Sequence, residues 1–213
     1  MFRNRQDAGQ QLAEAVRALG LRTPVVLGLP RGGVPVAAEV ARALAAPLDV
    51  LVVRKLGVPF QPELAMGAVG EGGVLVVNQR VVALSGTTAT ELAAAEQRER
   101  AALDEEVRRF RGDRPHIRLT GRTAVLVDDG IATGSTARAG CAVARALGAT
   151  HIVLAAPVCA RDSARQLAAD ADDVICLDLP RNFAAVGQFY ADFRATQDAD
   201  VLQLLDRAAR GGL

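Results

Sequence analysis

The sequence predicts an α/β fold with a doubly wound, mainly parallel sheet. Short apolar runs alternate with helical segments from residue 24 to residue 177, the pattern of a parallel sheet covered by helices. Two of the strand-to-helix turns are rich in glycine and other small residues. With 213 residues and 50% hydrophobic content, the chain can also bury the core that such a sheet needs.

The first 44 residues predict a helix, a strand and a second helix. Residues 7–19 carry apolar side chains at helical spacing and are followed by Gly20, a natural helix stop. Residues 24–29 form a short apolar run that predicts a strand. The next helix is expected to end near Leu44.

The loop before that helix is a candidate anion site. The backbone N–H groups of Gly32 and Gly33 can face an anion, Pro35 suits a first helical turn, and the Arg31 guanidinium can bind phosphate oxygens. Glycine-rich turns between a strand and a helix are common, so this loop alone identifies no ligand.

Residues 47–54 predict another strand, which ends in the cations Arg54 and Lys55. Ligands of open parallel sheets bind at the carboxyl ends of the strands, where these two charges are expected. An ordinary solvated strand end has the same pattern, so both interpretations stay open.

Residues 56–86 differ in composition from the segments around them. Glycines and prolines become frequent, and the apolar runs predict a flap hairpin with its turn near Gly72 and Gly73. With Glu63 ahead of the turn, this hairpin suits a lid over a reactive ligand. A structural hairpin at an oligomer edge is the alternative.

Residues 88–111 predict a long charged helix. Acids and bases recur at helical spacing, as in Glu96 with Arg100 and Glu105 with Arg109, so we expect a solvated face. Its end is mildly basic through four arginines, which lack the interleaved aromatics of a nucleic-acid surface: Arg108, Arg109, Arg111 and Arg114.

The most informative motif is VLVDDGIATGST at residues 125–136. An apolar strand ends in two adjacent acids, Asp128 and Asp129, and a loop of small residues then enters a helix predicted at residues 137–147. The unpaired N–H groups of the helix start and the loop hydroxyls can bind a phosphate. The acids would repel a bare phosphate, so the pattern favours a ligand with diol hydroxyls or a divalent cation, such as a sugar phosphate.

The last third of the chain predicts further strands and an aromatic segment. Residues 151–158 and 174–177 are expected to be strands, with a helix over 161–169 between them. Residues 180–193 hold three of the six phenylalanines and the only tyrosine, and residues 198–210 predict a closing helix. Clustered aromatics can cover a flat ligand such as a nucleobase, although a small satellite core is the alternative.

Composition narrows the class of protein. A formal net charge of +1 without a long basic block gives no indication of a nucleic-acid or membrane partner. The apolar runs are too short to span a membrane and the opening residues lack a signal-peptide core, so a cytoplasmic protein is expected. Cys141, Cys159 and Cys176 have no Cys-x-x-Cys spacing, and with His116 and His151 they predict no zinc set; buried core thiols are expected.

The motif at residues 125–136 resembles the phosphoribosyl-diphosphate signature of type I phosphoribosyltransferases, and the resemblance covers nearly the whole chain. It is most similar to a bacterial branch that shares the DDGIATG loop and an AVG-x-x-Y-x-DF segment and has no settled acceptor. The resemblance implies an α/β core at residues 1–178 that includes the flap at 56–86, followed by a small hood segment and closing helix at 179–213.

The resemblance also implies the site. Lys55, Asp128 and Asp129 are the candidate catalytic residues, with the two acids on the ribose hydroxyls and Lys55 on the pyrophosphate. The residues expected to bind phosphoribosyl diphosphate are Arg31, Gly32, Gly33, Arg54, Lys55, Asp128, Asp129, Gly130, Ile131, Ala132, Thr133, Gly134, Ser135 and Thr136. The base side is expected to include Phe183, Phe189, Tyr190 and Asp192. A cis peptide is expected between Pro30 and Arg31, as is frequent in the family's pyrophosphate loop.

The implied reaction transfers the 5-phosphoribosyl group from phosphoribosyl diphosphate to a nitrogen acceptor, with a nucleobase expected, and releases pyrophosphate. Mg²⁺ is the expected cofactor, held mainly through substrate oxygens with no protein ligand assigned. Similar enzymes for hypoxanthine and guanine carry an Asp where this chain has Ala132, which disfavours those bases. A homodimer stays open.

Two alternatives remain. A regulator that senses phosphoribosyl diphosphate without turnover would have the same fold, although near-neutral charge and the lack of an appended DNA-binding helix pair argue against it. A sugar-phosphate hydrolase would release pyrophosphate without any acceptor.

Overall fold

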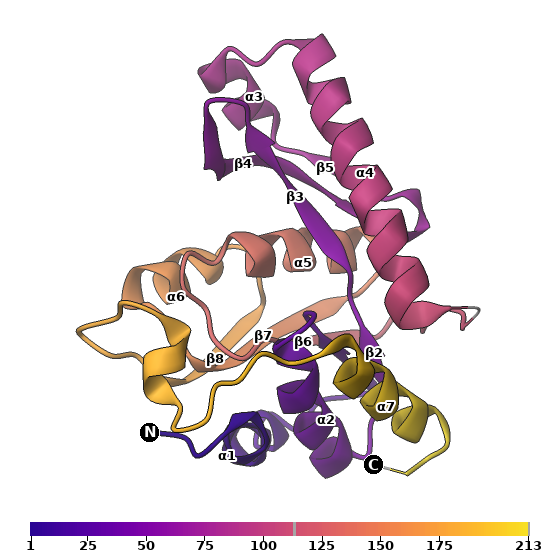
Figure 1. Ribbon diagram of the computed structural model, residues 1–213, viewed down its shortest axis with the longest axis vertical. Coiled ribbons are helices and arrows are strands. Elements are labelled where there is room, and N and C mark those ends of the chain that lie inside the picture. The colour runs from indigo at the N-terminus through magenta and orange to yellow at the C-terminus, as the bar shows by residue number, and fades with distance from the viewer. Residues whose placement is uncertain (113, 213) are drawn as a thin grey trace.

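The computed structural model describes residues 1–112 and 114–212. In this part of the chain, five parallel strands form the central sheet in the order β2-β1-β6-β7-β8 (Figure 1). The strands are β1 (Pro24–Gly28), β2 (Leu48–Val50), β6 (Thr123–Val127), β7 (His151–Val158) and β8 (Asp173–Asp178). Gly28 pairs with Val127, so β1 and β6 end side by side at one edge of the sheet.

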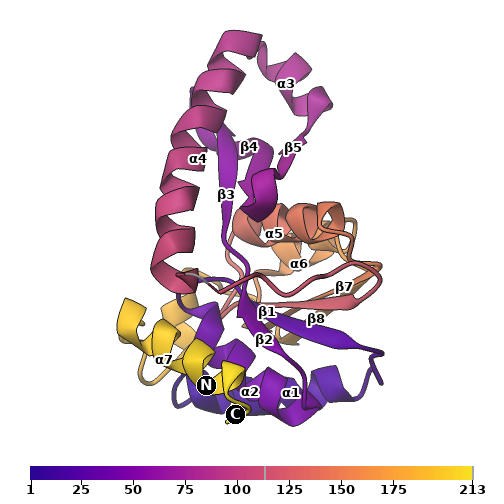
Figure 2. The ribbon, with the colours of Figure 1, turned by 90° about the vertical axis from the view of Figure 1, so that its right-hand side faces the viewer.

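Helices cover both faces of this sheet, which confirms the doubly wound α/β prediction. α1 (Arg5–Arg17) and α2 (Gly33–Leu44) lie on one face, and α5 (Ser135–Ala146) and α6 (Arg161–Leu167) lie on the other (Figures 1 and 2). α7 (Asp198–Ala209) packs beside β2 and α2. Successive strand residues point to opposite faces, so Val125 and Leu126 belong to separate buried clusters. Burial on both faces explains why the inner strands β1, β6 and β7 are mainly apolar runs.

A second, antiparallel sheet stands above the first as the predicted flap (Figure 2). It contains β3 (Val53–Val58), β4 (Gln61–Gly70) and β5 (Leu75–Val77), followed by α3 (Gln79–Ser85) and α4 (Ala89–Arg111). The turn between β4 and β5 places Gly72 at φ 69° and Gly73 at φ 79°. Only glycine adopts this left-handed backbone readily, so the predicted turn position is confirmed.

The predicted strand at residues 47–54 is divided between the two sheets. β2 ends at Val50, the Leu51 N–H still donates to Gly28 of β1, and the chain then enters β3. Arg54 and Lys55 therefore lie in the flap sheet rather than at the carboxyl end of a core strand, which corrects the prediction. A continuous apolar run cannot reveal that its two halves pair with different partners.

The long charged helix is confirmed as α4. Thr88 caps it through a capping box, and Glu96–Arg100 and Glu105–Arg109 form ion pairs at 2.8 and 3.2 Å. Arg111 departs from the prediction, because its side chain is buried between the acids Asp49 and Glu71 rather than solvated.

Cys159 and Cys176 form a disulfide, so the expectation of core thiols was wrong for this pair. Cys159 directly follows β7 and Cys176 lies in the adjacent β8, which brings together two residues that are distant in sequence. Cys141 is a free, buried thiol, as expected. Within the described residues, no helix has the length and apolar character needed to cross a membrane.

Candidate functional site

The loop between β6 and α5 surrounds a cavity of about 170 Å³. Its lining comprises Asp128, Gly130, Ile131, Ala132, Thr133, Gly134, Ser135, Thr136 and Ala137. The Thr133 and Ser135 hydroxyl oxygens lie 3.1 Å apart, at the start of α5. Free N–H groups of a helix start and converging hydroxyls are the groups that bind a phosphate.

The loop is held in shape by the next strand and helix. The Ile131 N–H donates to the Val158 carbonyl at 2.9 Å, and the Ala160 N–H donates back to Ile131 at 2.8 Å. The Ser163 hydroxyl donates to the Ala132 carbonyl. Because these bonds fix its backbone from both sides, the loop is preorganised for a ligand.

The glycine-rich loop before α2 touches the acid pair directly. A Cβ atom on Gly32 would overlap the Asp129 carboxylate, and one on Gly33 would overlap the Val127 carbonyl. Both glycines are therefore required by close approach of the two loops. The Pro30–Arg31 peptide bond is cis, which confirms that prediction.

Asp129 is paired with Arg5, a residue that the sequence did not single out. Arg5 Nε lies 2.7 Å from Asp129 Oδ2, and its Nη1 donates to the Arg194 carbonyl at 2.7 Å. The guanidinium also lies 4.0 Å from the centre of the Phe193 ring. No local motif marks Arg5, because its partner is 124 positions away in the chain.

Asp128 and Asp129 have unusual acidity. Burial raises the pKa of Asp128 to about 8, and the neighbouring Asp129 charge adds to this effect. Burial also raises the pKa of Asp129, although the Arg5 hydrogen bond and charge oppose it. Asp128 accepts a hydrogen bond from the Asp129 N–H at 2.8 Å but has no cationic partner comparable to Arg5 among the described side chains. Shifted acids beside a cavity mark a functional-site candidate.

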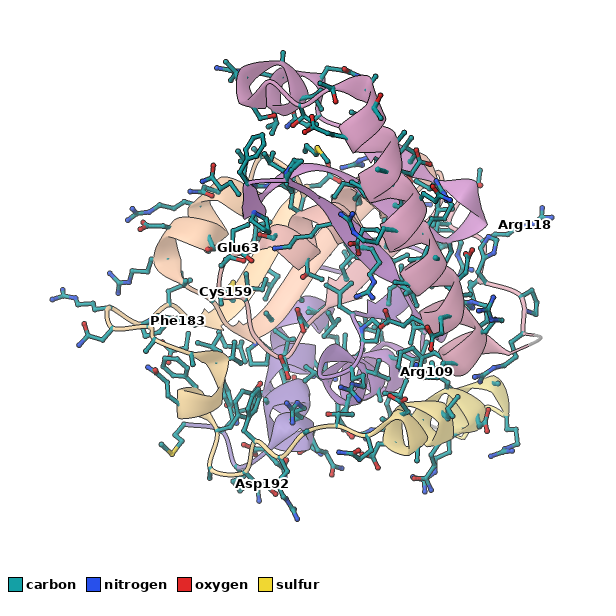
Figure 3. The ribbon with its side chains drawn as sticks, turned by 45° about the horizontal axis from the view of Figure 1, so that its top comes forward. Glu63, Arg109, Arg118, Cys159, Phe183 and Asp192 are labelled. Atoms are coloured by element: carbon teal, nitrogen blue, oxygen red, sulfur yellow. A yellow bond between two sulfur atoms is a disulfide. The ribbon has the colours of Figure 1, made fainter. Side chains whose placement is uncertain are left out.

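The predicted cations of the flap line a second cavity. Lys55, the only lysine in the sequence, and Arg54 help line this cavity of about 340 Å³ between the flap and α4. Thr136 belongs to both this cavity and the loop cavity, so the two adjoin. Lys55 Nζ lies 3.0 Å from Glu63, and Figure 3 shows Glu63 on the flap. The scarcity of lysine is a sequence signal that could have singled out Lys55 without any family resemblance.

Arg31 and Arg54 lie near acidic side chains. Arg31 pairs with Asp198 at 3.3 Å, while Arg54 Nε is 3.8 Å from Glu106 and 3.9 Å from Glu99. Within the described chain, Arg54 Nε is buried without a hydrogen-bond partner. Such a donor is costly unless a ligand or solvent satisfies it.

The aromatic residues of the predicted base side differ in burial, and Phe189 packs against the cluster that contains Tyr190. Phe183 and Phe189 are half-buried, with ring centres 5.5 Å apart. Tyr190 is instead buried against Phe2, and its hydroxyl donates to the Asp129 carbonyl. Its ring thus packs in a small satellite cluster with Phe2, while its assignment to the base side stays a prediction. Asp192 is tied to Arg194 at 2.6 Å, and hydrogen bonds from Arg194 lower the pKa of this acid.

A family model described as "Phosphoribosyl transferase domain" matches residues 3–194. This chain belongs to the phosphoribosyltransferase domain family. Two Mycobacterium tuberculosis proteins, from strains CDC 1551 and H37Rv and each named "Putative phosphoribosyl transferase", are 55% identical to it over 210 residues. The match covers 99% of this chain but 47% of each relative, so the chain spans about half the length of these curated relatives.

A solved structure also resembles this family member over its whole length. The crystal structure of TT1426 from Thermus thermophilus has a TM-score of 0.88 and 47% sequence identity. The match covers 96% of this chain and 97% of TT1426. The arrangement of core, flap and C-terminal segment is therefore shared with this relative.

Proposed function

We propose that this chain transfers the 5-phosphoribosyl group from phosphoribosyl diphosphate to a nitrogen acceptor and releases pyrophosphate. The observation that carries the proposal is the contact between two loops: the Gly32–Gly33 turn lies against the acid pair that begins the phosphate loop. Phosphate-binding groups, diol-binding acids and a cation-bearing loop therefore meet at one edge of the sheet, as a sugar carrying phosphates at both ends requires.

Each group has a proposed task in this reaction. The loop at residues 130–136 binds the 5-phosphate, Asp128 and Asp129 hold the ribose hydroxyls, and Arg31 with Gly32 and Gly33 binds the pyrophosphate. Lys55 and Arg54 come from the flap and neutralise the same leaving group. The anomeric C–O bond breaks, a bond from the acceptor nitrogen to the anomeric carbon forms, and the nitrogen loses its proton to solvent.

The residues present fit a magnesium ion held largely by the substrate. Mg²⁺ prefers oxygen ligands, keeps several waters and is commonly bound by one or two carboxylates together with phosphates. Asp128 lines the loop cavity and offers such a carboxylate, while the Asp129 carboxylate is engaged by Arg5. When bound, the ion would supply positive charge for the departing pyrophosphate.

We propose that the acceptor is a flat nitrogenous base and that residues 179–213 act as a hood over the core at residues 1–178. The half-buried Phe183–Phe189 pair supports this assignment, because aromatic rings pack on flat bases. Ala132 disfavours 6-oxopurines, since its side chain provides no acid or base.

The first test is a thermal and calorimetric titration with phosphoribosyl diphosphate and Mg²⁺. At a hundredfold excess over Kd the ligand should stabilise the fold by about 2.7 kcal/mol. Asp128→Asn should weaken binding, whereas Asp206→Asn, an exposed acid of α7, should not. Pyrophosphate release is then measured with a panel of bases: release without a base indicates a hydrolase, and binding without release for any base indicates a sensor.

Lys55→Ala should lower turnover by roughly a hundredfold to a thousandfold, because it removes a charge that stabilises the leaving group. The melting temperature should change little, since the ion pair that Lys55 forms is with the exposed Glu63. As the sole lysine, Lys55 can also be followed by an amine-selective reagent, from which pyrophosphate should protect it. Normal turnover of the alanine variant would contradict its assigned role.

A further inference from the structure

Asp198, the first residue of α7, lies between two guanidinium groups. Its Oδ1 is 3.3 Å from Arg31 Nη1, and its Oδ2 is 3.3 Å from Arg109 Nη1. Arg31 belongs to the loop before α2, whereas Arg109 lies near the end of α4, directly above α7 in Figure 3. Three segments that are far apart in sequence thus meet at one carboxylate.

Two arginines that converge on the two oxygens of one carboxylate form an anion site. The guanidinium donors that fit a carboxylate also fit phosphate oxygens. All three side chains remain partly accessible, with 52% exposure for Arg31, 46% for Arg109 and 34% for Asp198. A phosphate can therefore reach the arginines, and the Asp198 carboxylate occupies the position that its oxygens would take.

Further charged side chains of both signs lie near Asp198 and its two arginines. Glu106 lies one helical turn before Arg109 and is half-buried. Arg54 Nε lies 3.8 Å from Glu106, and burial raises the pKa of this acid against the smaller, opposing effects of the Arg54, Arg109 and Arg31 charges. Arg54 also has the buried Nε atom without a hydrogen-bond partner within the described chain. Although Glu99, Glu105 and Glu106 also pair with Arg54 and Arg109, that Arg54 Nε atom and the two arginines at Asp198 offer donors to an anion with several charged oxygens.

We propose that Arg109 is a further pyrophosphate-binding residue and that Asp198 is an internal competitor that the pyrophosphate displaces. The inference rests on the proposed function, in which Arg31 binds the same group. Displacement releases the start of α7 from the loop before α2 and from α4. Pyrophosphate binding is thereby coupled to the position of the closing helix.

The test uses calorimetry in the presence of Mg²⁺. The two probes are inorganic pyrophosphate and ribose 5-phosphate, titrated separately. Asp198→Asn should tighten pyrophosphate binding several-fold, because it removes the competing charge. Arg109→Gln should weaken pyrophosphate binding by about tenfold or more, the typical effect of losing a charged hydrogen bond. Both variants should bind ribose 5-phosphate as the wild type does, since that probe occupies the loop at residues 130–136.

Arg108→Gln is the matched control, because Arg108 is an exposed neighbour on the same helix. In the double variant Arg109→Gln/Asp198→Asn, removal of the Asp198 charge should increase the affinity for pyrophosphate by less than it does in the wild-type background. Circular dichroism melting checks that every variant is folded. Unchanged pyrophosphate affinity in the single variants, with both probes still bound, overturns this inference alone. Failure of the wild type to bind either probe overturns the proposed function as well.

Discussion

Two clusters in this chain, one buried and one partly buried, each combine two carboxylates with one arginine, but they satisfy their charges differently. In the first, Arg111 lies between Asp49 and Glu71 and links the end of α4, the central sheet and the flap turn. In the second, Arg5 pairs with Asp129, while the adjacent Asp128 has no comparable cation among the described side chains. The two clusters therefore contain similar residues, but both acids pair with the arginine only in the first.

The Arg111 cluster satisfies its hydrogen bonds internally. Arg111 donates to both Asp49 oxygens, to both Glu71 oxygens and to the Val50 carbonyl, at distances from 2.7 to 3.1 Å. Backbone N–H groups of Val52 and Ile117 donate to the same acids. Burial lowers the pKa of Arg111, but hydrogen bonds and charges from Glu71 and Asp49 raise it overall.

This difference indicates that the Arg111 cluster stabilises the fold, whereas the acid pair at residues 128–129 is a candidate ligand site. A buried charge is tolerated when each donor and acceptor has a partner, and the Arg111 cluster meets that condition. The acid pair at residues 128–129 does not, because burial shifts both pKa values upward despite Arg5. Unequal compensation of this kind is expected where a ligand supplies the missing interactions.

The largest expected effect is a loss of stability when the Arg111 cluster is disrupted. Arg111→Met should destabilise the fold by about 3–5 kcal/mol, because it leaves two buried acids without their cation. Urea unfolding measures this loss. The control is Arg118→Met, which removes an arginine from a more exposed part of the chain. A loss below about 1 kcal/mol, the range of exposed ion pairs, would show that the cluster is not a structural tie.

A smaller loss is expected at the second cluster. Arg5→Met should destabilise the fold by about 1–3 kcal/mol, since one buried acid loses a charged hydrogen bond. In contrast to Arg111→Met, it should also weaken binding of phosphoribosyl diphosphate, because Asp129 is no longer held in place. Equal ligand affinity in Arg5→Met and the wild type would remove the functional distinction between the clusters.

The pH dependence of stability sharpens the same comparison. Asp128 in the folded chain retains its proton up to about pH 8, whereas the unfolded chain loses it near the ordinary aspartate value. The contribution of Asp128 to stability without added ligand, measured as the difference between the wild type and Asp128→Asn, should therefore fall as pH rises between those values, by at most about 1.4 kcal/mol per pH unit. A difference that rises over the same range would contradict the assigned shift.

The smallest expected effect concerns a solvated pair. Glu105→Gln on α4 should change stability by about 0.5 kcal/mol or less, because the Glu105–Arg109 pair is exposed. Thermal melting in low and high salt checks this, and the small difference should shrink further in salt. A loss of stability comparable to that of Arg111→Met would contradict the assignment of the Glu105–Arg109 pair as solvated.

Features that depend on local sequence pattern can be predicted without the structure. Apolar runs and small-residue loops predict the strands and turns, because backbone geometry and burial act over a few neighbouring residues. The phosphate loop, the acid pair, the flap turn at Gly72 and Gly73 and the long helix α4 all follow from such patterns. The positions of these elements in the structure confirm those predictions, while the ligand roles of their residues remain proposals.

Contacts between side chains that are distant in sequence become visible only in the folded chain. The pairing of Arg5 with Asp129, the burial of Arg111 and the Asp198 carboxylate between Arg31 and Arg109 each join segments far apart in sequence. The division of residues 47–54 between two sheets and the Cys159–Cys176 disulfide have the same origin. The local sequence around an arginine or a cysteine is the same whether the side chain faces solvent or pairs with a distant residue. Its partner can therefore be identified only from the folded chain.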